Sequence, residues 1–178
     1  MNKKTNHLFL NVALALLMAL PTFGWAKAKV VLISGRDSHG SSAHNWGDGV
    51  DLLSNALTKE SGLDIETAIH KGGWPSDPSS FKGAATVVVL SAGGGRHSIS
   101  KYLRDFAVLA EKRVGLVCVH YAVEVPKGAP GNMLVKWVGG YFETFWSVSP
   151  HWTAEFKSIP KHPVANGVKP FTLKDEWY

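Results

Sequence analysis

The sequence lacks most of the features that mark a specialised class of protein. Cys118 is the only cysteine among 178 residues, so an internal disulfide cannot form. Charged residues make up only 19% against 45% hydrophobic residues, and no repeat or low-complexity segment occurs, which excludes disorder, collagen and coiled coil. A chain of this length buries roughly two-thirds of its unfolded surface, so it can fold on one hydrophobic core. We therefore expect one ordinary globular domain.

Two classes of ligand also lack their usual signals. The formal net charge is +5, but the basic residues are scattered and form no arginine-rich stripe, so no nucleic-acid partner is expected. No Gly-x-Gly-x-x-Gly opens a helix after the first predicted strand, and no Gly-Lys-Ser/Thr occurs, so no nucleotide cofactor is expected.

The N-terminus is typical of a secretory signal peptide. A short basic start is followed by the apolar run Leu8–Leu20 and then by small residues, with candidate cleavage motifs Gly24-Trp25-Ala26 and Ala26-Lys27-Ala28. The apolar run is short of the about 20 residues that span a bilayer, although an uncleaved anchor is the alternative. We expect residues 1–28 to be removed, and a periplasmic or secreted protein with no stable membrane insertion afterwards.

The rest of the chain alternates between strand and helix patterns. Apolar β-branched runs predict strands covered on both faces at Lys29–Ser34, Thr86–Ser91 and Val114–Val119, and alternation predicts another at Ile65–Ile69. Helical spacing follows between them, from Val50 to Leu57 and from Ile99 to Leu109, the latter with Ser98 as expected N-cap. Such alternation predicts an α/β protein with a flavodoxin-like open parallel sheet and helices on both faces.

The segment beyond Tyr121 has a different rhythm. A loop rich in proline and glycine precedes a short helical stretch at Met133–Val138, and alternation at Trp152–Phe156 predicts a strand near the sheet edge. We expect residues 29–178 to form one domain. The chain stops at Tyr178 without a closing element, which suggests a truncated piece of a longer protein.

Four histidines follow the predicted strands. His39 and His44 come after the first, His97 after the third and His120 directly after the fourth. Ligands of an open parallel sheet bind outside the carboxyl ends of its strands, so these loops are predicted to share a pocket. Histidine is both a proton carrier near neutral pH and a common metal ligand. Any one of them alone is more often a solvated or hydrogen-bonded loop residue.

Other candidates lie in the same loops. Gly94 and Gly95 permit close backbone approach to an anion or a sugar oxygen, or simply make a tight turn. A strand that runs straight into a sharp turn resembles a nucleophile elbow, with His120 at the turn and Tyr121 after it. Cys118 precedes it inside the apolar run, where we expect a buried and inert thiol. Trp46 and Trp146 are candidates for stacking on a sugar ring, the alternative being packing.

Several motifs together resemble the ThuA-like (trehalose utilisation) family. They are Gly115-Leu116-Val117-Cys118-Val119-His120, Gly139-Gly140, His162-Pro163-Val164-x-x-Gly167-Val168-x-x-Phe171 and Asp175-Glu176-x-Tyr178. The resemblance runs in order from about Lys29 to the last residue. The family positions that match are His39, His97, His120, His162, Glu176 and Tyr178.

The resemblance implies a three-layer fold like that of class I glutamine amidotransferases. Those enzymes carry a catalytic cysteine at the elbow where this chain has His120, so no amidotransferase activity is expected. It further implies a part in the catabolism of a disaccharide, a glycoside or its 3-keto derivative, and a divalent metal such as zinc near the histidines. For His162, a turn in which its side chain caps backbone groups is an equal alternative.

We therefore expect an exported enzyme that acts on a small carbohydrate. His120, Glu176 and His97 are the predicted catalytic residues, and His39, His120 and Glu176 the predicted metal ligands. The predicted substrate contacts are His44, Trp46, Gly94, Gly95, Tyr121, Trp146 and Tyr178. The alternative is a non-catalytic carbohydrate-binding domain of a larger cell-envelope protein. The sequence leaves the exact reaction and the oligomeric state open.

Overall fold

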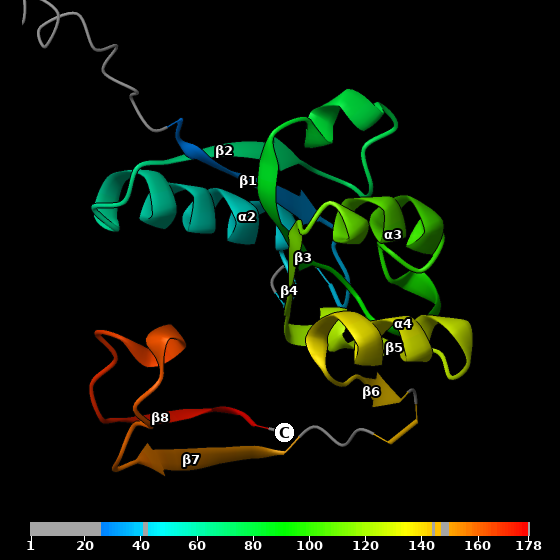
Figure 1. Cartoon of the computed structure of the whole chain (residues 1–178). Helices are drawn as coiled ribbons and strands as arrows, with labels where there is room; N and C mark the ends of the chain where they lie inside the picture. Colours follow the sequence, from blue (N-terminus) through cyan, green and yellow to red (C-terminus); the bar gives the residue numbers. More distant parts are fainter. Residues whose placement is uncertain (1–25, 41–42, 144, 147–149, 178) are drawn as a thin grey trace, which may run out of the picture.

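The computed structural model describes residues 26–40, 43–143, 145–146 and 150–177 (Figure 1). Most of the predicted signal peptide, and Tyr178, lie outside these described residues. The first strand begins at Ala28, whose backbone N–H donates to the carbonyl of Asp64 at 3.0 Å. Of the two candidate cleavage motifs, the one that ends at Ala26 therefore leaves this strand whole. In the described part of the chain, no helix is long and apolar enough to cross a membrane.

A four-stranded parallel sheet forms the centre of the molecule. Its strand order is β2-β1-β3-β4, and every neighbouring pair is parallel. The strands are β1 (Ala28–Ser34), β2 (Ile65–His70), β3 (Ala84–Leu90) and β4 (Gly115–Val119). All four lie where the apolar runs and the alternation predicted them, so the prediction of an α/β protein with an open parallel sheet is confirmed.

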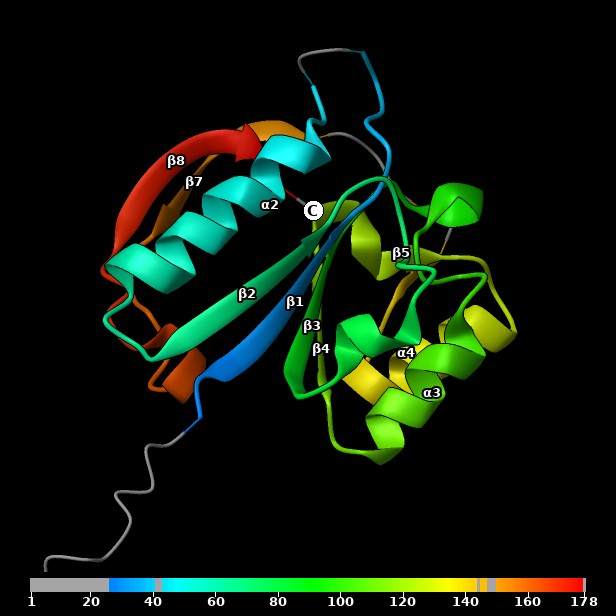
Figure 2. The same cartoon turned by 90° about the horizontal axis from the view of Figure 1, so that it is seen from above.

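Helices lie against both faces of this sheet (Figure 2). One face carries α2 (Trp46–Asn55), which continues as a π-helical turn over Ala56–Glu60. The other carries α3 (Leu103–Glu111) and α4 (Ala129–Val138). Successive residues of a strand point to opposite faces. Val30 and Leu32 of β1 accordingly pack with Trp46 and Val50, whereas Val31 and Ile33 pack in the core that contains Phe106.

The start of α3 differs from the prediction. Ser98 was expected to cap this helix, but the helix begins at Leu103 after Tyr102. The reason is the side chain of His97, whose Nδ1 accepts a hydrogen bond from the backbone N–H of Ile99 at 3.1 Å. The segment between His97 and α3 forms tight turns, in one of which the N–H of Tyr102 donates to the carbonyl of Ile99 at 2.7 Å.

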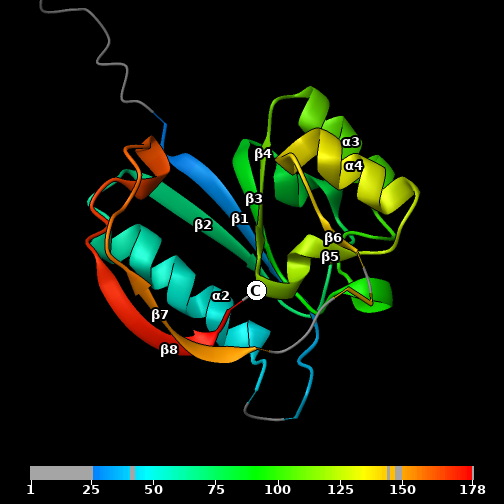
Figure 3. The same ribbon diagram turned by 90° about the horizontal axis from the view of Figure 1, so that it is seen from below.

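The last strands form a separate antiparallel pair, so the prediction that Trp152–Phe156 lies near the edge of the main sheet is wrong. β7 (His151–Phe156) pairs with β8 (Phe171–Glu176) and not with β4. This hairpin lies on the α2 side of the sheet (Figures 2 and 3). Apart from Ala154, its strand residues are at least partly exposed, so the alternation reflects hairpin pairing rather than burial. A short parallel pair, β5 (Glu124–Val125) and β6 (Phe142–Glu143), completes the fold.

His162 has the structural role that was one of its two expected alternatives. It lies between β7 and β8 and caps the 3-10 turn Pro163–Ala165, with its Nδ1 accepting from the N–H of Val164 at 3.2 Å.

Candidate functional site

Five aromatic and imidazole rings gather beyond the carboxyl ends of β1 and β4. His44 lies at their centre, with ring-centroid distances of 4.7 Å to His39, 4.8 Å to Trp46, 5.1 Å to His120 and 5.5 Å to Tyr121. The rings of His39 and Tyr121 are stacked at 5.9 Å. Of the four histidines predicted to share a pocket, three are therefore brought together. We call these five residues the histidine cluster.

The loop after β1 closes on itself to present two imidazoles. Ser38 and His44 form an isolated antiparallel bridge, with the N–H of Ser38 donating to the carbonyl of His44 at 3.3 Å. Nδ1 of His39 and Nδ1 of His44 lie 2.8 Å apart, and Oγ of Ser38 is 3.1 Å from the first and 3.3 Å from the second. A hydrogen bond between two Nδ1 atoms needs one donor and one acceptor, so the two rings share a single proton between these atoms.

The electrostatics of the histidine cluster favour a neutral His44. Burial lowers the pKa of His44 most strongly, and the neighbouring imidazoles of His120 and His39 lower it further by repulsion. The carboxylate of Glu176 acts in the opposite direction and raises this pKa. All three groups are therefore close enough to His44 to interact with it electrostatically, although Glu176 comes from a segment more than 50 positions further along the chain.

His120 occupies a sharp elbow at the end of β4. Its φ is +56°, in the left-handed region, and it opens the 3-10 turn His120–Val123 directly after Val119. His39, in the loop after β1, also has a left-handed φ of +60°. A non-glycine residue in this region costs about 1–2 kcal/mol, and such residues cluster at functional sites. The backbone thus holds two of the clustered histidines in strained conformations, and the elbow is of the kind the sequence indicated.

A cavity of about 310 Å³ opens beside His120, and we call it the His120 cavity. It is lined by His120, Tyr121, Val123, Glu124, Phe142, Glu176 and Trp177. Glu176, at the end of β8, is half-buried and lines this cavity together with His120, as its predicted role requires. The lining of the His120 cavity thus combines aromatic rings with two carboxylates and an imidazole.

Several residues that line the His120 cavity were not predicted from the sequence. Phe142 and Trp177 supply aromatic surface, and Glu124 supplies a second carboxylate. For Trp177 a signal existed, because it stands inside the Asp-Glu-x-Tyr motif whose glutamate was selected. Phe142 and Glu124 lie in the two-residue strands β6 and β5, which are too short to leave a periodic pattern in the sequence.

His97 does not join the histidine cluster, and its geometry differs from the predicted catalytic role. The side chain is only 4% exposed. Its Nε2 lies 2.6 Å from the carbonyl of Ala122, and its Nδ1 accepts from the N–H of Ile99. Both ring nitrogens are therefore engaged by backbone groups, which leaves neither for a ligand. Since Ala122 belongs to the turn that carries His120, His97 holds that turn in place.

Replacement of His97 by leucine is expected to destabilise the fold by about 1–3 kcal/mol. The variant leaves the carbonyl of Ala122 and the N–H of Ile99 buried without a partner, which is the costly way to lose a hydrogen bond. Urea unfolding at pH 7.5 measures the change. His162→Asn is the matched control, because His162 is exposed and asparagine can still cap its turn.

The same histidine makes stability depend on pH. Burial lowers the pKa of His97 below its ordinary value of about 6.5, so the folded chain takes up this proton less readily than the unfolded chain. The contribution of His97 to the free energy of unfolding is fully present above about pH 6.5 and is lost as the pH falls below that value. The His97→Leu variant should show a flatter decline between pH 7.5 and 5 than the wild type. Equal slopes in the two proteins would contradict the assignment.

The remaining predicted contacts are dispersed. Trp46 belongs to the histidine cluster but is buried, with its ring stacked on that of His44. Gly95 lines a different pocket beside Arg96 and His97, and Gly94, with φ +58°, makes the turn beside it. Trp146 is 77% exposed and lines none of the described pockets. Tyr178 lies outside the described residues.

Of the predicted metal ligands, His39 and His120 belong to the histidine cluster, and Glu176 lines the His120 cavity. Across residues 26–40, 43–143, 145–146 and 150–177, no three histidine, cysteine, aspartate or glutamate side chains are placed to hold a metal ion. Two nitrogens do converge, Nδ1 of His39 and Nδ1 of His44, but they are joined to each other by a hydrogen bond.

Comparison with known proteins finds no family model, no curated protein and no solved structure that matches this chain.

Proposed function

We propose that this chain is a ThuA-like enzyme that processes a small carbohydrate, with His120 transferring a proton to or from the sugar. The observation that carries the proposal is the position of His120, on a left-handed elbow at the carboxyl end of β4, in one cavity with Glu176 and three aromatic rings. Strained backbone, a titratable side chain and a shaped cavity coincide at this residue, as they do at many catalytic sites.

The walls of the His120 cavity suit a sugar. One side of a pyranose ring presents C–H groups, which pack against the faces of aromatic side chains, and its edge presents hydroxyls. Tyr121, Phe142 and Trp177 supply the aromatic surface, whereas Glu124 and Glu176 supply acceptors for hydroxyl protons. The volume of about 310 Å³ is at the lower end of the range for small-molecule sites, which favours one sugar unit over a long chain.

The chemistry that these groups support is general acid–base catalysis. An imidazole both accepts and donates a proton near neutral pH, which suits His120 for a proton transfer beside the carbonyl of a 3-keto-glycoside or at its glycosidic oxygen. Glu176 shares the cavity and is placed to orient the hydroxyls or to balance the charge of a protonated His120. His44, which is hydrogen-bonded to His39, packs edge-on against the ring of His120 at 5.1 Å.

The finer fold assignment is part of the same proposal. A parallel sheet of order β2-β1-β3-β4 with helices on both faces supports the three-layer class I glutamine amidotransferase-like architecture. Amidotransferase activity is not proposed, because histidine stands at the elbow. Cys118, two positions earlier, is no substitute nucleophile, since burial raises the pKa of its thiol to about 11 and keeps it protonated.

We propose export as the location of this activity, on the basic start and apolar run of the N-terminal sequence. N-terminal sequencing of the protein from a periplasmic fraction tests this. We expect cleavage after Ala26, which keeps Ala28 in β1, in place of removal of residues 1–28.

The experiment that tests the function is turnover of 3-keto-glycosides. The purified chain is incubated with 3-keto-trehalose and 3-keto-glucosides, and the free sugar released is quantified against a no-protein control. Product that grows in proportion to protein supports the enzyme. Saturable binding of these compounds with no product at high protein concentration contradicts the enzyme and favours a carbohydrate-binding domain.

A divalent metal remains a separate proposal, which rests on the resemblance and on the convergence of two Nδ1 atoms. If it is right, the purified protein carries about one zinc per chain and the His39→Ala variant has lost it. Elemental analysis of both proteins after dialysis makes the comparison. Equal and negligible zinc in the two removes the metal from the proposal and leaves the acid–base role of His120 unaffected.

A further inference from the structure

We propose that a second pocket, at the carboxyl ends of β1, β2 and β3, binds the oxyanion of a small ligand, a phosphate or a carboxylate. It encloses about 590 Å³ and is lined by residues from three loops, among them Arg36, Arg96, Lys101, Gly73, Gly95 and Trp74. We call it the Arg96 pocket. None of its residues lines the His120 cavity, so the inference does not depend on the proposed sugar chemistry.

The position of the Arg96 pocket follows from the strand order. β1 ends at Ser34, β2 at His70 and β3 at Leu90, and the lining residues come a few positions after each of these ends. The three strands are parallel neighbours, so their following loops meet at one edge of the sheet. In open α/β sheets this edge, outside the carboxyl ends of the strands, is where ligands bind.

The described lining of the Arg96 pocket carries three cations against one carboxylate, Asp37, which leaves a net positive charge. Arg36, Arg96 and Lys101 line it, and within the described part of the chain none of the three forms an ion pair. Burial lowers the pKa of His97, which keeps this fourth lining group neutral. Charged donors that line a shared hollow and form no ion pair are the arrangement that attracts an oxyanion.

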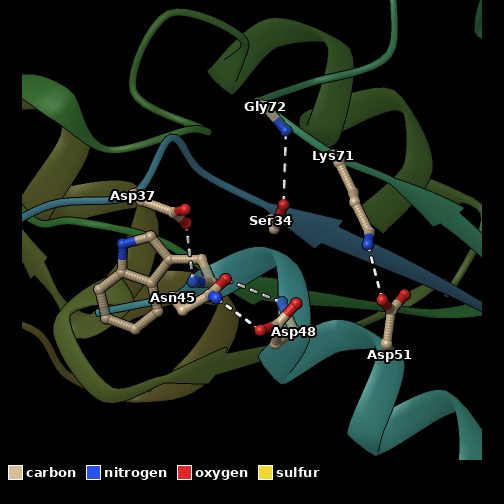
Figure 4. Close-up of polar contacts among 8 residues, drawn as sticks. Ser34, Asp37, Asn45, Asp48, Asp51, Lys71 and Gly72 are labelled. Atoms are coloured by element: carbon tan, nitrogen blue, oxygen red, sulfur yellow. Dashed lines mark hydrogen bonds and ion pairs between the residues drawn. The ribbon is translucent and has the colours of Figure 1, made fainter. Parts of the chain in front are cut away.

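The acidic residues nearby are already engaged (Figure 4). Asp37 is the only carboxylate in the described lining, and its Oδ1 accepts from the backbone N–H of Trp46 at 3.0 Å. Asp51 pairs with the ammonium of Lys71 at 2.6 Å. The carboxylate of Asp51 on α2 is thus paired with Lys71, and Asp37 alone offsets one of the three cations of the Arg96 pocket.

The floor of the Arg96 pocket gives a ligand access to backbone. Gly72 and Gly73 have left-handed φ values of +84° and +132°, and a Cβ built on either, or on Gly95, would meet nothing within 4 Å. The N–H of Gly72 donates to Oγ of Ser34 at 3.4 Å, so Gly73 and Gly95 are the positions that permit the close backbone approach an oxyanion needs. Trp74 forms a firm wall, because its ring stacks on Tyr102 at 5.7 Å and packs against Phe81 at 4.7 Å.

Titration of the full-length protein with inorganic phosphate and, separately, with acetate tests the proposal. In amide proton–nitrogen NMR spectra at low salt, we expect saturable shifts of the Gly72, Gly73 and Gly95 signals. Arg36→Gln and Arg96→Gln should each weaken binding about tenfold, which is the worth of one charge-assisted hydrogen bond. Arg104→Gln is the matched control, since Arg104 is an exposed arginine on α3 outside the pocket. It should bind as the wild type does.

The two anions distinguish the source of the oxyanion. Tighter binding of phosphate indicates a phosphorylated ligand, and tighter binding of acetate indicates a carboxylate such as that of a sugar acid. The proposal is overturned if neither anion shifts the three glycine signals, or if phosphate binds equally to wild type, Arg36→Gln and Arg96→Gln. Turnover of neutral 3-keto-glycosides is measured independently. Absence of anion binding therefore does not contradict the proposed function, and absence of turnover does not contradict the proposed anion site.

Discussion

The His120→Ala variant is expected to lose turnover of a 3-keto-glycoside by about 10²–10⁴-fold. This is the usual contribution of one positioned general acid or base, and alanine has no proton to give or accept. His120 is exposed at the elbow, so its removal leaves the cores on both faces of the sheet untouched. Initial rates of sugar release by the two proteins at equal concentration measure the effect.

Two further variants separate loss of chemistry from loss of structure. His120→Gly should lose as much activity as His120→Ala. Its free energy of unfolding in urea should nevertheless be about 1 kcal/mol higher than that of His120→Ala, because glycine adopts φ +56° without strain. His162→Asn should keep full turnover, since His162 caps a turn between β7 and β8. Turnover of His120→Ala within twofold of the wild type would show that proton transfer by this residue is not the catalytic step.

The Phe106→Ala variant is expected to lose about 3–5 kcal/mol of folding free energy. Phe106 on α3 is fully buried, and its ring meets Trp137 of α4 edge-on at 4.6 Å and Trp74 at 6.4 Å. Truncation removes a large apolar side chain and leaves a cavity that the surrounding rings and the sheet cannot fill completely. Urea unfolding followed by tryptophan fluorescence measures the loss.

Val108→Ala is the control for Phe106, because Val108 lies on the same helix and is half exposed. We expect it to change stability by no more than about 0.5 kcal/mol. A cost below about 1 kcal/mol for Phe106→Ala would mean that α3 does not pack on the sheet in the way described.

The sheet could be predicted because its signal is local. Each central strand is a short apolar run, and burial on both faces demands apolar side chains at every position of it, as in Val30, Val31, Leu32 and Ile33. Parallel pairing then follows from the helices between the strands. The elbow was predictable for a similar reason, since an apolar strand that runs into His120 leaves this residue at the turn.

Two of the errors share a physical cause, which is that the competing contacts are distant in sequence, whereas the shifted start of α3 has a local cause. Ser98 has the residue type of an N-cap, but the ring of His97 holds the N–H of Ile99 and delays the helix. His97 itself follows a strand as a site residue would, yet the carbonyl of Ala122, 25 positions away, engages its Nε2. The strand β7 alternates as an edge strand does, and only its pairing with β8 shows that it belongs elsewhere.

By itself, the amino-acid order determined the four parallel strands, the helices between them and the edge at which ligands would bind, because hydrophobic periodicity records which faces are buried. Only the tertiary structure decided which histidines meet. His44, paired with His39, reaches His120 because the loop after β1 folds back on itself through Ser38, and Glu176 reaches the His120 cavity on a hairpin. His97 instead forms a hydrogen bond with the backbone carbonyl of Ala122. A local pattern carries no information on such partners, since they are selected by the packing of loops that are far apart in the chain.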